Sequence, residues 1–138
     1  MSQHLDFNQK VIDEFRANEG VCGGPFEGAP MVLITMTGAK SGRELTSPLV
    51  YSTNGDDPVI IASMAGAPTN PNWFHNLVAN PAVKVEIGTE AFDATAVQLE
   101  GAERDRVYAA QAEMMPQFAE YAEKAAPRVI PVFRLVRS

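Results

Sequence analysis

The sequence predicts an α+β fold, a small and mostly antiparallel β-barrel with peripheral helices. Six short segments have the composition and alternation of strands, at residues 31–37, 46–53, 59–64, 83–87, 91–99 and 130–136. No helical pattern lies between the first three, which disfavours a parallel sheet because parallel strands need long crossovers. The 138 residues and 46% hydrophobic content are enough for one core, so we predict a single domain over residues 1–138.

The N-terminal segment, residues 1–18, is predicted to be an amphipathic helix because Val11, Ile12 and Phe15 fall near helical spacing. A loop rich in glycine and proline follows over residues 19–30. We expect the helix to pack on the barrel, since its acidic bias disfavours a membrane surface. A lid over a binding site is the other role open to it.

Proline and turn signals set the remaining boundaries. Pro48, inside the second strand, predicts an edge position or a bulge because proline donates no ladder hydrogen bond. Asn54-Gly55-Asp56-Asp57 is a hairpin turn signal before the third strand. Further helices are predicted at residues 72–79, 102–115 and 118–125. Asn80-Pro81 ends the first of these, and Pro116 separates the other two.

Charge and cysteine content narrow the classes of function. Lys and Arg number 11 against 17 Asp and Glu, a net charge of −6, which argues against nucleic-acid binding and electrostatic docking on an anionic membrane. Cys22 is the only cysteine, so we expect no internal disulfide and a reducing, cytoplasmic location. We also expect no membrane span and no signal peptide, since the sequence has no apolar run of sufficient length.

The segment Gly38–Arg43, Gly-Ala-Lys-Ser-Gly-Arg, is the sharpest local feature. Its glycines permit a tight turn that exposes backbone N–H groups, and Lys40, Ser41 and Arg43 add cationic and hydroxyl donors. Such a turn suits a phosphate group. An ordinary hairpin turn with solvated charges is the alternative.

Two more segments could line a binding site. Residues 62–68 place small side chains at the end of a buried strand, where a flat ligand could approach the backbone or the next loop could pack closely. In residues 71–77, Trp73 could stack on a ring and Asn76 could hydrogen-bond to it. The alternative is that Trp73 and Leu77, four residues apart on a helix, both fill the core.

The chain is poor in catalytic groups of its own. It has no cluster of His, Cys or carboxylates with metal-ligand spacing, so no metal is expected, and it has no nucleophile motif. If the protein is an enzyme, a bound cofactor should supply the reactive atom.

The motifs of this chain resemble those of the deazaflavin-dependent nitroreductase family, in order and spacing, from about Met31 to the C-terminus. They are residues 35–42, 48–49, 62–68, 70–77 and 80–81, then Tyr121 and residues 130–132. The resemblance implies a split β-barrel of the FMN-binding type. It also implies the cofactor coenzyme F420, a deazaflavin with a phosphate-bearing polyglutamate tail.

The same resemblance assigns roles to residues. F420 would be bound by Lys40, Ser41, Gly42, Arg43, Pro48, Ala62, Ser63, Met64, Gly66, Ala67, Trp73 and Asn76, of which the loop residues would hold the phosphate and tail. The substrate would contact Val50, Met115, Phe118 and Tyr121. Ser63 and Tyr121 would be the catalytic residues, which position or protonate the substrate. Relatives carry an arginine where this chain has Leu45, and Arg43 would replace it.

The activity implied is that of an F420H2-dependent oxidoreductase, which transfers a hydride from C5 of the reduced deazaflavin to a quinone or another activated alkene or nitroaromatic. Its partner would be a small hydrophobic electron acceptor, and the protein would be a monomer or a weak dimer. An FMN-dependent split-barrel oxidoreductase and a non-catalytic F420 carrier are the alternatives. The Lys-Ser-Gly loop and the segment around Trp73 favour the deazaflavin branch over FMN.

Overall fold

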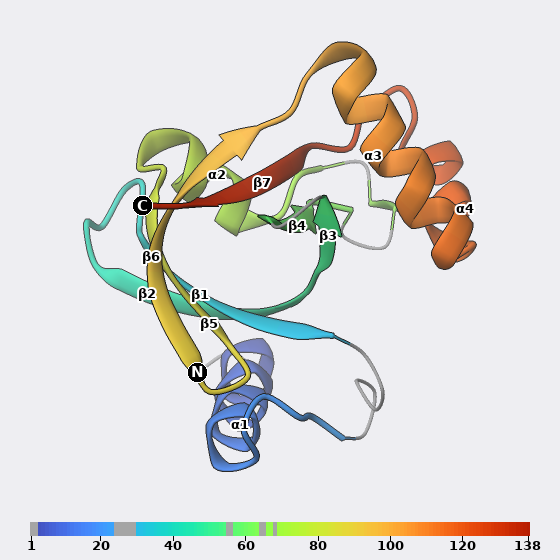
Figure 1. The fold of residues 1–138 in the computed structure, drawn as a ribbon. Coiled ribbons are helices and arrows are strands. Elements are labelled where there is room, and N and C mark those ends of the chain that lie inside the picture. Colours follow the sequence, from blue (N-terminus) through green and yellow to red (C-terminus); the bar gives the residue numbers. More distant parts are fainter. Residues whose placement is uncertain (1–2, 24–29, 55–56, 64–65, 68) are drawn as a thin grey trace.

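The computed structural model describes residues 3–23, 30–54, 57–63, 66–67 and 69–138 (Figure 1). Its helices are α1 (Gln3–Ala17), α2 (Asn72–Ala79), α3 (Gly101–Met114) and α4 (Gln117–Ala125). Its strands are β1 (Met31–Thr37), β2 (Glu44–Val50), β3 (Ser52–Asn54), β4 (Asp57–Ile61), β5 (Ala82–Ile87), β6 (Glu90–Gln98) and β7 (Val132–Arg137).

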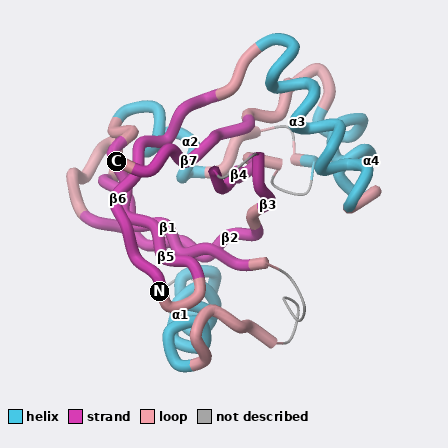
Figure 2. The backbone as a smooth tube through the Cα atoms, in the orientation of Figure 1, coloured by secondary structure: helices cyan, strands magenta, loops and turns pink. Residues whose placement is uncertain are grey.

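The strands form one curled sheet in the order β2-β1-β5-β6-β7-β4-β3, and every neighbouring pair is antiparallel. The predicted antiparallel α+β fold is therefore confirmed. The two strands at the ends of this order, β2 and β3, follow one another in the chain with only Tyr51 between them. The sheet must therefore curl until its edges lie close together, and Figure 2 shows this open barrel.

The structure divides one predicted strand, residues 46–53, into β2 and β3. β2 pairs with β1 as far as Val50, whereas β3 pairs with β4 from Ser52 onward. Between them the N–H of Tyr51 donates to the carbonyl oxygen of Pro30 at 3.0 Å. The side-chain alternation continues across this point, so the pattern does not reveal the change of partner. Pro48 lies in the edge strand β2, as predicted.

Strand β1 is buried on both faces, which places it at the centre of the molecule. Val32, Ile34 and Met36 face the main core together with Leu77 of α2. Met31 and Leu33 lie on the other face and pack against α1 with its following segment. A strand covered on both faces holds its register firmly, because a one-residue slip would exchange the two sets of side chains.

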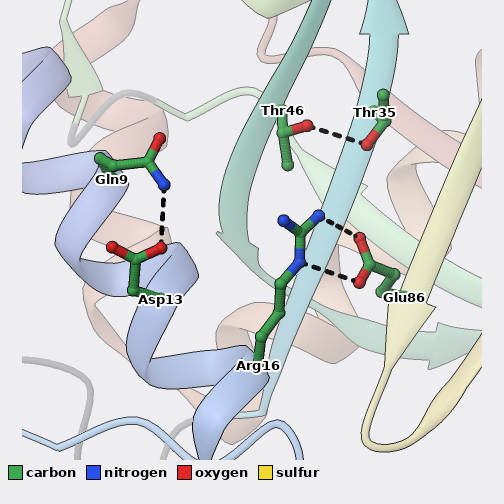
Figure 3. A network of polar contacts seen from close by, with 6 residues as sticks. All are labelled: Gln9, Asp13, Arg16, Thr35, Thr46 and Glu86. Atoms are coloured by element: carbon green, nitrogen blue, oxygen red, sulfur yellow. Dashed lines mark hydrogen bonds and ion pairs between the residues drawn. The ribbon is translucent and has the colours of Figure 1, made fainter.

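Helix α1 packs on the outside of the barrel, as predicted, through Val11, Ile12 and Phe15. Arg16, near its C-terminal end, makes two hydrogen bonds of 3.2 and 2.8 Å to the carboxylate of Glu86 on β5 (Figure 3). The Arg16 side chain is 51% exposed, so this pair contributes little stability beside the apolar contacts. α1 is thus held to the sheet over β1, β2 and β5.

Helices α3 and α4 cover the opposite end of the barrel around a second core, formed with β4 and β7 (Figure 1). Val107 and Tyr108 of α3 and Ala125 of α4 are its buried helical residues. None of the described helices is long and apolar enough to cross a membrane.

Candidate functional site

A cleft of about 740 Å³ lies where the two edges of the curled sheet approach each other. This volume falls within the range of sites that hold cofactors and drug-sized ligands. β2 supplies a continuous stretch of its wall, Leu45–Val50, which spans about 16 Å at the rise of an extended strand. The predicted residues Pro48 and Val50 therefore both line the cleft.

The elements around the cleft come from distant parts of the chain. α1 contributes Asn8, Gln9 and Ile12, so the helix forms a wall of the cleft as well as packing on the barrel. The remaining walls come from β4, the start of α2, and the facing ends of α3 and α4. Sequence reasoning did not identify these α1 residues, because nothing in the helical pattern shows which flank meets the cleft.

Trp73, the only tryptophan in the chain, lies between the cleft and the main core. It lines the cleft, and it also packs against the main core with its ring edge-on to Phe133, the centroids 6.0 Å apart. Leu77, one helical turn later, is fully buried in the same core. The core contact fixes the orientation of the indole, which gives the cleft a rigid aromatic surface.

Asn76 also lines the cleft, and its side chain is hydrogen-bonded to the protein. Its Oδ1 accepts from the backbone N–H of Ala39 at 2.9 Å, and its Nδ2 lies 3.6 Å from the sulfur of Met36. Asn76 thus joins α2 to the segment 38–43. This contact sets that segment beside the end of the cleft where Leu45 lies.

The segment 38–43 is a tight turn that begins at the buried Gly38 and exposes residues 39–43. The N–H of Gly38 donates to the carbonyl of Arg43 at 2.8 Å, and the N–H of Gly42 donates back to Gly38 at 3.0 Å. Ser41 Oγ accepts from the N–H of Arg43 at 3.2 Å, and Gly42 has a φ of +70°, which glycine adopts without strain. Among the described residues, no acceptor pairs with the backbone N–H groups of Lys40 and Ser41.

The structure therefore separates eight of the twelve predicted cofactor residues into two groups. Pro48, Ser63, Trp73 and Asn76 line the cleft. Lys40, Ser41, Gly42 and Arg43 are exposed beside it, and none of them is among its lining residues. A ligand contacting both groups would need a ring in the cleft and an extension that reaches the turn.

The residues after β4 differ in whether they line the cleft. Ser63 lines the cleft, whereas Ala62 is fully buried. Met64 lies outside the described residues. Gly66 has a φ of +80°, and a Cβ there would come within 3.1 Å of the Tyr121 Cα on α4. Close packing against α4, one of the two alternatives for this segment, therefore accounts for Gly66; neither Gly66 nor Ala67 lines the cleft.

Arg128 holds this segment in place, and sequence reasoning missed it. Its Nε and Nη2 donate to the carbonyl of Ala67 at 3.0 and 2.7 Å, and Nη2 also donates to Ser63 at 2.9 Å. Its Nη1 donates to the carbonyl of Ala62 at 3.0 Å and to Asn70 Oδ1 at 2.7 Å. All five guanidinium N–H groups therefore have acceptors, which is the full capacity of arginine. A single arginine before the last strand gives no sequence signal of this role.

The predicted substrate residues Met115, Phe118 and Tyr121 come together at the α3–α4 end of the cleft. The rings of Phe118 and Tyr121 meet edge-on, with centroids 5.3 Å apart. Behind them the hydroxyl of Tyr108 donates to the backbone carbonyl of Phe118 at 2.5 Å. Burial raises the pKa of the Tyr108 hydroxyl, so this donor stays protonated.

The polar groups at this end are few. Ser63 and Tyr121, the two predicted catalytic residues, both line the cleft. Two further polar side chains, Gln111 of α3 and Gln117 of α4, line it as well and were not predicted. In the part of the chain that the structure describes, no three His, Cys, Asp or Glu residues are arranged to hold a metal ion.

Comparison with known proteins identifies relatives of this chain. An F420H2-dependent quinone reductase of Mycobacterium tuberculosis is 41% identical over 83 residues, which cover 59% of this chain and 56% of that protein. The chain thus matches little more than half the length of this curated relative.

Solved structures extend the similarity to most of the fold. An F420-H2 dependent reductase, FDR-A, has a TM-score of 0.69 at 41% identity, over 77% of this chain and 93% of that one. A structure described as a domain-swapped dimer has a TM-score of 0.72 at 34% identity, over 96% and 99% of the two chains. The expected split barrel and the resemblance to deazaflavin-dependent reductases are confirmed. The family model of F420H2-dependent quinone reductases matches residues 8–136, and the chain therefore belongs to the F420H2-dependent quinone reductase family.

Proposed function

We propose that this protein is an F420H2-dependent reductase that reduces a quinone or a similar small, electron-poor acceptor. Family membership supports the cofactor and the reaction class. The observation that carries the proposal is the cleft itself. At one end, Leu45 and Asn76 line it beside the cationic turn 38–43, and at the other end Phe118 and Tyr121 form an aromatic cluster. One site can thus take an anionic cofactor at one end and an apolar acceptor at the other.

The residues present fit the tail of F420. Lys40 and Arg43 are exposed cations on the turn, and the N–H groups of Lys40 and Ser41 have no acceptor among the described residues. Phosphate oxygens would accept from such donors, and the cationic side chains would add attraction. Asn76 would support tail binding indirectly, because its hydrogen bond to the N–H of Ala39 holds the turn in position.

The middle of the cleft fits the ring. Pro48, Ser63 and Trp73 offer a largely apolar surface with one hydroxyl, the kind of lining that binds a flat heterocycle. When bound there, reduced F420 would supply the hydride. Contacts of the ring with Ala62, Met64, Gly66 and Ala67 remain predictions. In this proposal Arg128 fixes the backbone at Ser63, which lines the cleft where the ring would lie.

The acceptor would occupy the space bounded by Val50, Met115, Phe118 and Tyr121. The aromatic pair would exclude water from the reacting face, and the hydroxyl of Ser63 or Tyr121 would orient the acceptor or give it a proton. A cytoplasmic location, a monomeric or weakly dimeric state and a single domain over residues 1–138 also remain predictions.

The test uses the purified protein in two stages. Fluorescence titrations with oxidised F420 and with FMN should give saturable binding of F420 and much weaker binding of FMN. Menadione added to the complex with F420H2 should then restore oxidised F420 faster than in a protein-free control. Binding of FMN alone would support the FMN-dependent alternative, and F420 binding without menadione-dependent oxidation would support the carrier.

A further inference from the structure

Gln111 on α3 is a buried amide that none of the roles above uses. Its residue is 4% exposed, and it lines the cleft next to Met115. Within the described ranges it is the one buried residue with an amide or charged side chain. An amide in such a position normally has hydrogen-bond partners for both of its ends.

The hydrogen bonding of Gln111 is incomplete. Its Oε1 is buried and has no partner among the described residues. Its Nε2 donates to the thioether sulfur of Met115 at 3.1 Å, and thioether sulfur is a weak acceptor. An amide nitrogen carries two N–H groups, so a second donor remains available. The side chain therefore has unused hydrogen-bonding capacity at the wall of a ligand-sized cleft.

The surroundings would strengthen any bond that this amide makes to a ligand. Val59, Ile61, Met115 and Phe118 are apolar residues that line this end of the cleft with it. A hydrogen bond in such low-dielectric surroundings is stronger than the same bond in water. A ligand that brings a carbonyl oxygen to this end would meet a neutral donor and no competing charge.

We propose that Gln111 recognises the electron acceptor, with its Nε2–H donating to a carbonyl oxygen of a quinone bound against Phe118. The proposal rests on the reductase function above. A quinone that receives a hydride carries a negative charge on an oxygen until a proton arrives, from Ser63, Tyr121 or water, and completes the hydroquinone. Gln111 gives up no proton in this step, and its N–H stabilises the charge that develops on the oxygen.

The substitution Gln111→Met separates this role from a structural one. Methionine is about as long as glutamine and fills the same space, but it removes the unpaired carbonyl and the donor together. The variant should therefore melt at the same or a higher temperature and keep its F420 affinity. Its kcat/KM for menadione should fall by about tenfold or more, the effect of losing one hydrogen bond in the transition state.

Two comparisons complete the experiment. Gln98→Met makes the same change at an exposed residue of β6 that does not line the cleft, and it should leave menadione reduction unchanged. A phenazine dye, an acceptor without a carbonyl oxygen, should be reduced equally well by the wild type and by Gln111→Met. Quenching of Trp73 fluorescence by menadione, measured without F420, should need a higher concentration in the variant. Gln111→Leu gives a second apolar variant if the first is poorly folded.

The outcomes are distinct. Loss of menadione reduction with retained phenazine reduction, F420 binding and melting temperature supports the role of Gln111. Two results would overturn this role. One is a kcat/KM for menadione that is the same in the wild type, Gln111→Met and Gln111→Leu; the other is an equal loss of activity with menadione and with the phenazine dye. A wild-type protein that binds F420 but reduces no quinone overturns the proposed function and this inference together.

Discussion

The Nη2 of Arg128 donates a hydrogen bond to the backbone carbonyl of Ser63 at 2.9 Å, so the segment before β7 is tied to the end of β4. The same guanidinium also holds the carbonyls of Ala62 and Ala67. Three carbonyls within six residues are thus arranged around one planar cation. The wall of the cleft next to the proposed ring site is fixed by a residue that does not itself line the cleft.

Arg128→Lys should weaken F420 binding and lower stability together. An ammonium group cannot reach all the acceptors of the guanidinium fork, so at least one buried carbonyl loses its partner. We expect a loss of about 2–4 kcal/mol in the free energy of unfolding. Chemical denaturation and F420 titration measure the two effects.

Arg104→Lys is the matched control for Arg128. Arg104 donates from Nε and Nη2 to the carbonyl of Ile130 and does not contact the segment after β4. The Arg104→Lys variant should be less stable than the wild type but should keep the F420 affinity of the wild type. Unchanged F420 binding in Arg128→Lys would contradict the role given to Arg128.

Lys40→Ala should weaken F420 binding, and more at low salt than at high salt. The exposed ammonium would act on the anionic tail by long-range attraction, which salt screens. Titrations at two salt concentrations measure this difference, with Lys84→Ala, an exposed lysine on β5, as the control. An affinity that is the same as the wild type at both salt concentrations would make the segment 38–43 an ordinary turn.

Tyr121→Phe should lower turnover and leave F420 affinity unchanged. The variant keeps the edge-on contact with Phe118 and removes only the hydroxyl at the acceptor end of the cleft. Steady-state kinetics with menadione and an F420 titration test this prediction. A large loss of F420 binding would instead assign Tyr121 to the cofactor or to the fold.

Tyr108→Phe tests the buried hydroxyl behind the aromatic pair. Loss of its bond to the carbonyl of Phe118 should cost about 1 kcal/mol of stability near neutral pH. Burial raises the pKa of Tyr108 above its ordinary value of 10.0, so the folded state disfavours ionisation. The stability of the wild type should therefore begin to fall as the pH rises above that ordinary value, because only the unfolded chain then ionises.

Comparing the wild type with Tyr108→Phe isolates the effect of Tyr108 ionisation on stability. The stability gap between the wild type and Tyr108→Phe should narrow from about pH 8 to about pH 10.5, since the phenylalanine variant lacks this titration. Denaturation curves at the two pH values give the gap. A gap that stays constant or widens would mean that Tyr108 is not held in its protonated form.

The sequence predicts most of the fold, because alternation and turn residues are local signals. β1 and the helices α2, α3 and α4 lie within two residues of their predicted bounds. The change of partner at Tyr51 was not predictable, because it depends on which distant strand each half meets. The curl of the sheet, and hence the cleft, follows from that change.

The site was predicted in part. Pro48, Ser63, Trp73, Phe118 and Tyr121 were identified by resemblance, and all of them line the cleft. Arg128 and Gln111 were missed for physical reasons. The acceptors of Arg128 lie 58 to 66 residues away in the chain, and no local pattern joins them to it. Gln111 has the residue type of a solvent-facing helix position, and only the packing of α3 buries it.

A single-turnover experiment tests whether the cofactor and the acceptor react in one cleft of this protein. The protein is loaded with F420H2, mixed rapidly with increasing concentrations of menadione, and followed by the return of the oxidised deazaflavin fluorescence. We predict a protein-dependent rate that saturates with menadione, as expected when cofactor and acceptor share one cleft. A rate no greater than that of free F420H2 at every menadione concentration would mean that the protein does not catalyse this reduction.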